Sequence, residues 1–142
     1  MVDLGILVDG SDTHDAINFG SPCGMGICSE HIGEGGGPPH VHGDPYGPTC
    51  LYNNNATYYP TTASHPPMIG FTYDGGFIYG RYLTSDSEGY YVSIDACGGH
   101  SHGTYGYHYH TQVTTFSFHG TNFPMTTGGP YLCWRGNVTN TT

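Results

Sequence analysis

The chain has 142 residues, enough for one domain with a modest hydrophobic core. Eleven acidic residues face only two arginines and no lysine, so the formal net charge is −9. Such a chain repels nucleic acid and offers no polybasic patch to a membrane surface, and no apolar run reaches the roughly 20 residues of a membrane helix. We therefore expect neither nucleic-acid binding nor membrane insertion.

The first ten residues contain a short apolar run that suits a buried strand. Its members are Leu4, Ile6, Leu7 and Val8. The polar residues up to position 20 follow as a tether. A strand on a tether can be added to the sheet of a neighbouring subunit, and head-to-tail donation of this kind builds a filament. Residues 1–20 are thus predicted to be a donor arm that joins copies into a homopolymer. The alternative is that the strand pairs within its own sheet.

Glycine and proline dominate residues 32–48, so we expect an ordered loop there rather than core. A polar excursion follows, with an N-glycosylation acceptor at Asn55-Ala56-Thr57. Two more acceptors begin at Asn137 and Asn140, inside the Thr-rich tail 137–142. Acceptors in a polar tail indicate an exported, extracellular chain that carries N-linked glycans.

Aromatic and β-branched runs alternate with turns through the rest of the chain. Residues 68–73 and 77–82 flank Asp74-Gly75-Gly76 and predict a hairpin, because Asp-Gly tolerates the positive φ of a two-residue turn. Asp74 is expected to accept hydrogen bonds from the turn amides. Further strands are predicted at 90–94, 105–116, 118–123 and 131–134. We find no helical periodicity, so the fold class is mainly β, a small irregular β-sandwich or barrel with long Gly/Pro-rich loops.

Two groups of cysteine and histidine have nearly the same spacing. The first is Cys28-x2-His31 followed by His40-x-His42. The second is Cys97-x2-His100 followed by His108-x-His110, and the intervals differ by one residue. This repeat indicates an internal duplication, with copies at about residues 23–52 and 92–136. Because side chains two apart on a strand share a face, the histidines of each H-x-H pair project together.

Each copy offers three imidazoles to a metal ion. The two sets are His31, His40 and His42, and His100, His108 and His110, with His102 as a spare near the second set. Three histidines with an open position suit zinc, and nitrogen-rich sites also suit copper(II). Two alternatives are open: the histidines stack on aromatic rings and bond carbonyls as structural groups, or they are solvated at the surface. Asp95 is expected either to orient a ligating imidazole or to hold a strand end.

Five cysteines leave one over in an exported chain. The duplication suggests that each copy closes on its own following cysteine, giving Cys28–Cys50 and Cys97–Cys133, with Cys23 free or intermolecular. The rival pairing of Cys23 with Cys28 leaves Cys50 unpaired, and the spacing does not exclude it.

Several motifs occur in an order that resembles the YHYH domain family. They are Cys28-x2-His31, His42-Gly43-Asp44-Pro45 leading to Cys50, His65-Pro66-Pro67-Met68-Ile69-Gly70-Phe71, Tyr73-Asp74-Gly75-Gly76-Phe77, Asp95-Ala96-Cys97-Gly98-Gly99-His100, Tyr107-His108-Tyr109-His110 and Cys133-Trp134-Arg135-Gly136. The first copy, Pro39-His40-Val41-His42, lacks both tyrosines, and Gly76-Phe77 stands where the family usually has Phe-Pro. The resemblance implies a small secreted domain over residues 21–136, and it indicates fold and compartment better than activity.

The leading function hypothesis is an extracellular, glycosylated structural protein that forms a filament or coat and uses its histidines as metal-binding or stabilising sites. No phosphate loop, nucleophile elbow or Ser-His-Asp order is present. The first alternative is a secreted zinc or copper metalloenzyme that uses the second histidine set with an open coordination position. The second alternative is a carbohydrate-binding module that presents some of the thirteen tyrosines to sugar rings.

Overall fold

Every regular element in the described part of this computed structural model is a β-strand. The described residues are 3–7, 12–14, 26, 28–32, 36–42, 44–45, 47, 49–50, 64–118, 121–127 and 133–136. For residues 3–7, 12–14, 31, 112–118 and 121–127 the backbone alone is described. The mainly β prediction is confirmed over these residues, while closure into a sandwich or barrel stays a prediction.

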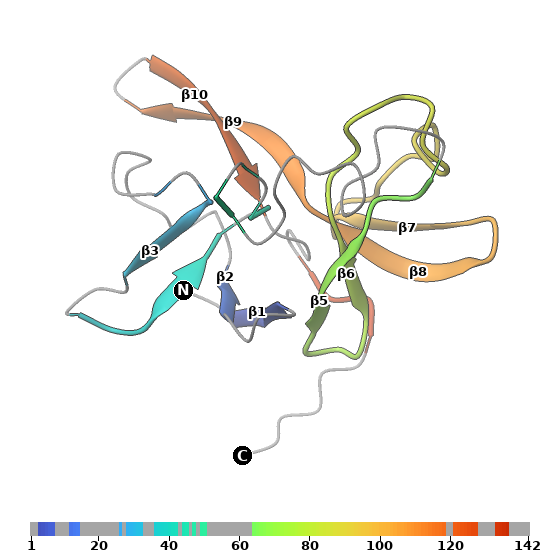
Figure 1. Cartoon of the computed structure of the whole chain (residues 1–142). Coiled ribbons are helices and arrows are strands. Elements are labelled where there is room, and N and C mark those ends of the chain that lie inside the picture. The colour runs from blue at the N-terminus through green and yellow to red at the C-terminus, as the bar shows by residue number, and fades with distance from the viewer. Residues whose placement is uncertain are drawn as a thin grey trace.

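Eight strands form one sheet in the order β3-β4-β2-β1-β5-β6-β8-β7, and β9 and β10 form a separate hairpin (Figure 1). The strands are β1 (Asp3–Leu7), β2 (Asp12–His14), β3 (Glu30–Ile32), β4 (Pro39–Val41), β5 (Met68–Thr72), β6 (Phe77–Tyr79), β7 (Gly99–His102), β8 (Tyr105–His110), β9 (Gln112–Phe118) and β10 (Thr121–Thr127). The four strands β5, β6, β8 and β7 carry the candidate site described below.

The two halves of the eight-stranded sheet have the same strand order. It is β3, β4, β2 and β1 from one end, and β7, β8, β6 and β5 from the other. Hairpins β1–β2 and β5–β6 are both antiparallel, β2–β4 and β6–β8 are both parallel, and β3–β4 and β7–β8 are both antiparallel. Gly5 lies opposite Thr13 as Gly70 lies opposite Ile78, and both hairpins have an irregularity at the same point. The strand pairing thus repeats between β1–β4 and β5–β8, with β1–β2 as the counterpart of β5–β6. The duplication with copies at about residues 23–52 and 92–136 stays a prediction.

The two halves meet where β1 pairs antiparallel with β5, and Ile6 lies opposite Phe71 at the centre of that pairing. Gly5 faces Thr72 and Leu7 faces Gly70, so the pairing has local two-fold symmetry. In this structure β1 therefore pairs within its own chain, which was the alternative to donation. Residues 11–20 are more than a tether, because they contain β2, which joins β1 to β4.

The predicted hairpin of residues 68–82 is confirmed, but its turn is longer than the two residues expected. The Gly75 amide donates to the Thr72 carbonyl, and the Thr72 amide donates to the Gly76 carbonyl, each at 3.0 Å. Gly75 has a φ of 84°, which a residue with a side chain rarely adopts. An irregular step between Met68 and Gly70 also offsets the ladder.

Several predictions of local structure were wrong. The segment 32–48 is not loop alone, because it contains β4, whose Val41 is buried. Residues 90–94 form turns rather than a strand: the Val92 amide donates to the Gly89 carbonyl at 2.9 Å, and Tyr91 is 83% exposed. The aromatic and β-branched residues there favour a strand, but the side chains of Tyr90, Tyr91 and Val92 are exposed.

The strand predicted at 105–116 is divided: β8 ends at His110, and β9 begins at Gln112 after the single residue Thr111. The return strand predicted at 118–123 is shifted and runs as β10 from Thr121 to Thr127. Of the last predicted strand, 131–134, Cys133 and Trp134 are not in a strand, and the two residues before them lie outside the described part.

The aliphatic core of the described residues is small: Val41, Ile69 and Ile78, with Leu83 packed against them. Most other buried positions are polar, and histidine is prominent among them. They include His40, His42, His65, His100, His108 and His110. Buried polar side chains need partners, so the contacts of these imidazoles determine what the protein can do.

Each predicted copy is closed by one disulfide, Cys28–Cys50 in the first and Cys97–Cys133 in the second. They confirm the pairing that the duplication suggested and exclude the rival pairing of Cys23 with Cys28. Cys23 itself lies outside the described residues. Two disulfides indicate an oxidising environment of the extracellular kind.

Candidate metal centre

Four histidines from three parts of the chain converge between β6, β7 and β8. His108 and His110 lie two apart on β8, His102 ends β7, and His65 precedes β5. One ring nitrogen from each lies within 4.8 Å of the other three, and the group could hold a metal ion. His65, His108 and His110 are at most 8% exposed.

Backbone carbonyls fix the orientation of three of these rings. The Nδ1 of His65 lies 2.9 Å from the Pro66 carbonyl oxygen. The Nδ1 of His108 lies 2.7 Å from the Gly106 carbonyl, and the Nδ1 of His110 lies 2.7 Å from the Gly80 carbonyl. A carbonyl oxygen only accepts, so each Nδ1 carries the hydrogen and each neutral ring presents a lone pair at Nε2.

These Nε2 atoms face one another at short range. His65 Nε2 lies 3.1 Å from His108 Nε2, which lies 3.0 Å from His110 Nε2. Burial lowers the pKa of His65 to about 4 and that of His110 to about 2, with the charges of neighbouring histidines acting in the same direction. Burial also lowers the pKa of His108. Near neutral pH no proton bridges the three lone pairs, and neutral imidazole is the form that binds metal.

The spacing of the nitrogens fits a metal ion. Zinc–nitrogen bonds of about 2.0–2.1 Å in a tetrahedron place two ligand nitrogens about 3.3 Å apart, close to the contacts of His108 with His65 and His110. A ligating histidine usually donates its other N–H to a carbonyl or carboxylate, as these three do. The residues present therefore suit zinc or copper(II), which both favour imidazole.

His102 is the fourth member and is less constrained. Its Nδ1 is buried without a hydrogen-bond partner and lies 3.8 Å from a Glu88 carboxylate oxygen. Its ring packs on Gly89, where a Cβ would overlap the imidazole. Gly89 also has a φ of 87°, so glycine is required there both by conformation and by space.

The four-histidine set differs from the one expected from spacing. His100, a predicted ligand, lies beside the group but outside it. Its Nδ1 donates to the Val92 carbonyl at 2.8 Å, and its Nε2 lies 3.3 Å from the Tyr82 hydroxyl. His102, considered a spare, belongs to the set. His65 was missed as a ligand, since it lies outside both copies and no spacing links it to them.

The opposite face of β8 has a different role. The Tyr109 hydroxyl donates to Asp74 at 2.5 Å, and the Tyr107 hydroxyl donates to Asp95 at 3.0 Å. The Arg135 amide donates to the Tyr109 oxygen at 2.7 Å, and its guanidinium pairs with Asp95 at 2.8 Å. Alternation along this six-residue strand therefore places the candidate metal-binding face on one side and, on the other, a face that bonds Arg135.

Each carboxylate behaves as one of the predicted alternatives. Asp74 accepts from the Gly76 amide at 3.2 Å, as predicted for a turn residue, and from Tyr109 as well. Asp95 accepts from the Cys97 amide at 2.8 Å, which is the strand-end role. The hydrogen bonds described for it include none to an imidazole.

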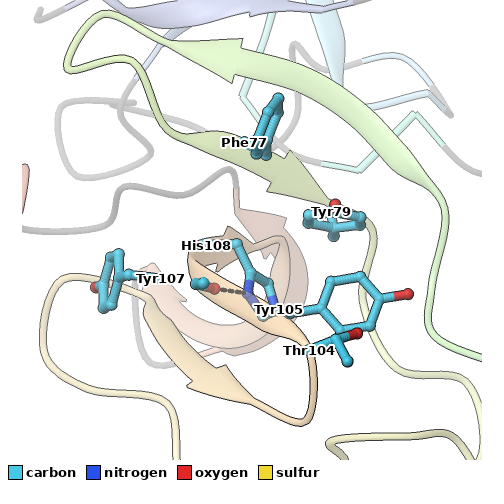
Figure 2. A pocket seen from close by; sticks show the side chains of 7 residues that line it. Phe77, Tyr79, Thr104, Tyr105, Tyr107 and His108 are labelled. Carbon is cyan, nitrogen blue, oxygen red and sulfur yellow. Dashed lines mark hydrogen bonds between the residues drawn. The ribbon is translucent and has the colours of Figure 1, made fainter.

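An aromatic groove of about 260 Å³ lies beside the histidines. Its lining is Phe77, Tyr79, Thr104, Tyr105, Gly106, Tyr107 and His108. Figure 2 shows Tyr79 of β6 and Tyr105 of β8 close to His108, with the bond from His108 to Gly106 dashed. Tyr105 stacks on His65 with ring centroids 4.1 Å apart. Aromatic rings of β6 and β8 thus line a groove beside the candidate metal centre.

The other predicted sites have mixed outcomes. His40 and His42 of the first copy are buried with their Nε2 atoms 3.1 Å apart. The side chain of His31 is not described. Leu4, Ile6 and Leu7 lie in β1. Val8, Asn55, Asn137 and Asn140 lie outside the described residues.

No family model, curated protein or solved structure matches this chain. The resemblance to the YHYH domain family therefore stays a prediction. Within the described residues, no helix is long and apolar enough to cross a membrane. Function must be argued from the site itself.

Proposed function

We propose that this protein binds a zinc or copper(II) ion through His65, His102, His108 and His110, and that the ion stabilises the fold. One observation carries the proposal. Three buried imidazoles donate through Nδ1 to backbone carbonyls and turn their Nε2 lone pairs toward one another. Without a cation those lone pairs repel, whereas a metal ion uses all of them at once.

A structural ion fits this arrangement better than a catalytic one. Structural zinc sites are closed by four protein ligands, while catalytic sites keep a position for water or substrate. The set has four histidines, and three of them are almost fully buried. In a chain with so small an aliphatic core, an ion that crosslinks β8, β7 and the segment before β5 replaces hydrophobic stabilisation.

The proposed setting is extracellular. An oxidising environment agrees with the two disulfides, and the acceptors at Asn55, Asn137 and Asn140 would carry N-linked glycans there. We propose a secreted, glycosylated structural domain of the YHYH type. The acidic, lysine-free composition supports solubility outside the cell.

The direct test is the metal content of protein purified without chelator. We expect close to one zinc or copper ion per chain at the four-histidine site, and a His108→Gln/His110→Gln variant that loses it. His100→Gln is the matched control, because His100 is a buried imidazole beside the group that is not a member of it. The proposal is contradicted if the wild type holds no metal after incubation with zinc or copper(II), or if the double variant holds as much metal as the wild type.

Filament assembly by strand donation is a further part of the proposed function. The support comes from the sequence, in which polar residues follow the apolar run Leu4, Ile6, Leu7 and Val8. Pairing of β1 with β5 of its own chain is the competing arrangement. Electron microscopy of the purified protein decides between them, since only monodisperse monomers, with or without residues 1–12, would remove donation from the proposal.

A metalloenzyme is the second candidate, and the aromatic groove beside His108 is the observation that favours it. Catalysis needs a coordination position open to substrate. Azide added to the copper-loaded protein tests for such a position. A change in the visible spectrum would support an open site, and an unchanged spectrum would leave the closed structural site.

A further inference from the structure

We infer that the first half of the chain holds a second metal site, built on His40 and His42, the counterparts of His108 and His110. The inference rests on the proposed metal function of the second half. It goes beyond that function because neither histidine belongs to the four-histidine group.

The backbone around the two pairs is arranged in the same way. His31 lies opposite His40 on β3–β4, as His100 lies opposite His108 on β7–β8. The His42 amide donates to the Ser29 carbonyl at 2.8 Å, and the His110 amide donates to the Gly98 carbonyl at 2.9 Å. In each case the acceptor follows the half-cystine of its own half.

That acceptor also has the same unusual conformation in both halves. Gly98 has a φ of 86°, and Ser29 has a φ of 61° although serine rarely adopts positive values. Such strain is maintained where surrounding structure requires it, and it is common at functional sites. The first half thus has the same local geometry although serine stands there in place of glycine.

The imidazoles repeat the geometry of the candidate metal centre. His40 Nδ1 lies 3.3 Å from the Pro38 carbonyl two residues earlier, as His108 Nδ1 lies 2.7 Å from that of Gly106. The Nε2 atoms of His40 and His42 are 3.1 Å apart, against 3.0 Å in the second half. The ring centroids are 5.0 Å apart with planes at 62°, against 4.9 Å and 66°.

Burial agrees as well. His40 is 4% exposed and His42 is 0% exposed, so these rings are covered nearly as completely as their counterparts. The Pro38 carbonyl fixes hydrogen at His40 Nδ1, which leaves the His40 Nε2 lone pair directed at His42. In this orientation one cation contacts both Nε2 atoms, as proposed for the second half.

The ligand set indicates which ion this site prefers. The described ligands are two imidazoles, half the number in the four-histidine group, and copper(II) stands above zinc in affinity for nitrogen ligands. We therefore expect copper(II) to bind here more weakly than at the four-histidine site. A chelator titration should remove the ion of the first half before that of the second.

Copper(II) titration of the full-length protein, with glycine as a competitor against weak surface binding, tests the inference. We expect the wild type to bind two ions, the His40→Gln/His42→Gln variant to bind one, and the His108→Gln/His110→Gln variant to bind one. Electron paramagnetic resonance of the wild type should resolve two nitrogen-ligated species, and each variant should lack one of them.

The outcomes separate the two claims. If the wild type binds a single ion that the His40→Gln/His42→Gln variant keeps, the second site is refuted and the proposed function stands. If the single ion depends on His40 and His42 instead, the second site stands and the four-histidine site fails. A wild-type spectrum with a single nitrogen-ligated species overturns the inference even when a variant does not fold. In that case His40 and His42 share a proton rather than a metal ion.

Discussion

Replacing Tyr109 by phenylalanine tests how the two faces of β8 divide their roles. Tyr109 is fully buried, donates its hydroxyl to Asp74 at 2.5 Å and accepts from the Arg135 amide at 2.7 Å. A hydrogen bond to a charged group contributes about 1.5–3 kcal/mol, and leaving a buried amide unpaired costs about 1–3 kcal/mol. Since water can reach the exposed Arg135, we expect a loss of about 2–4 kcal/mol in the free energy of unfolding.

Urea unfolding with the disulfides intact, followed by Trp134 fluorescence, measures this loss. Tyr107→Phe is the matched control, because it removes one hydroxyl from the same face while Asp95 keeps Arg135 at 2.8 Å and the Cys97 amide at 2.8 Å. We expect a loss of about 1 kcal/mol for that variant. Equal losses in the two variants would refute the special role of the Tyr109–Asp74 bond.

The difference should also depend on pH. Burial alone would raise the pKa of Asp74, but hydrogen bonds from Thr72, Tyr109 and the amides of Gly136 and Gly76 hold it below its ordinary 3.8. A carboxylate with a lowered folded-state pKa stabilises the fold above its unfolded value, and this contribution disappears as pH falls through the folded value. The gap between wild type and Tyr109→Phe should therefore persist at pH 7 and narrow on acidification below about pH 4.

Three further predictions concern the metal centre. Chelation should lower the melting temperature of the wild type, and added zinc or copper(II) should restore it; no change on chelation would contradict a stabilising ion. The metal-free protein should lose stability as pH falls below the unfolded histidine pKa of about 6.5. The cause is that burial lowers the pKa of His65 to about 4 and of His110 to about 2 in the fold. Urea unfolding at pH 8, 6 and 5 should show this decline in the free energy of unfolding, and a flat profile would count against it. Gly89→Ala should weaken metal binding and lower the free energy of unfolding by about 1–2 kcal/mol, because Gly89 has a positive φ and the added Cβ overlaps His102. Gly106→Ala is the control: no atom lies within 4 Å of the added Cβ, so metal affinity should be unchanged.

Features set by local spacing were predictable from the sequence. The alternation of β8 placed His108 and His110 on one face, and Asp74-Gly75 marked a hairpin. The repeated cysteine positions gave both disulfides. In each case the information lies within a few residues or within a repeated interval.

Features set by long-range assembly were not predictable. His65 reaches the metal centre from a segment far from β8 in sequence, and no interval connects it to the other ligands. The counterpart of β5–β6 in the first half was missed because β1–β2 shares few residue types with it, although both have Gly followed four residues later by Asp-Gly. Residues 90–94 misled because an apolar run indicates burial only when other elements cover it.

X-ray absorption at the zinc or copper edge of the metal-loaded protein tests the central claim most directly. We predict a first shell of about four imidazole nitrogens at about 2.0–2.1 Å with no sulfur near 2.3 Å, and loss of this signal in His108→Gln/His110→Gln. An oxygen-only shell, a sulfur contribution, or a spectrum that the double variant leaves unchanged would contradict a metal centre built on these histidines.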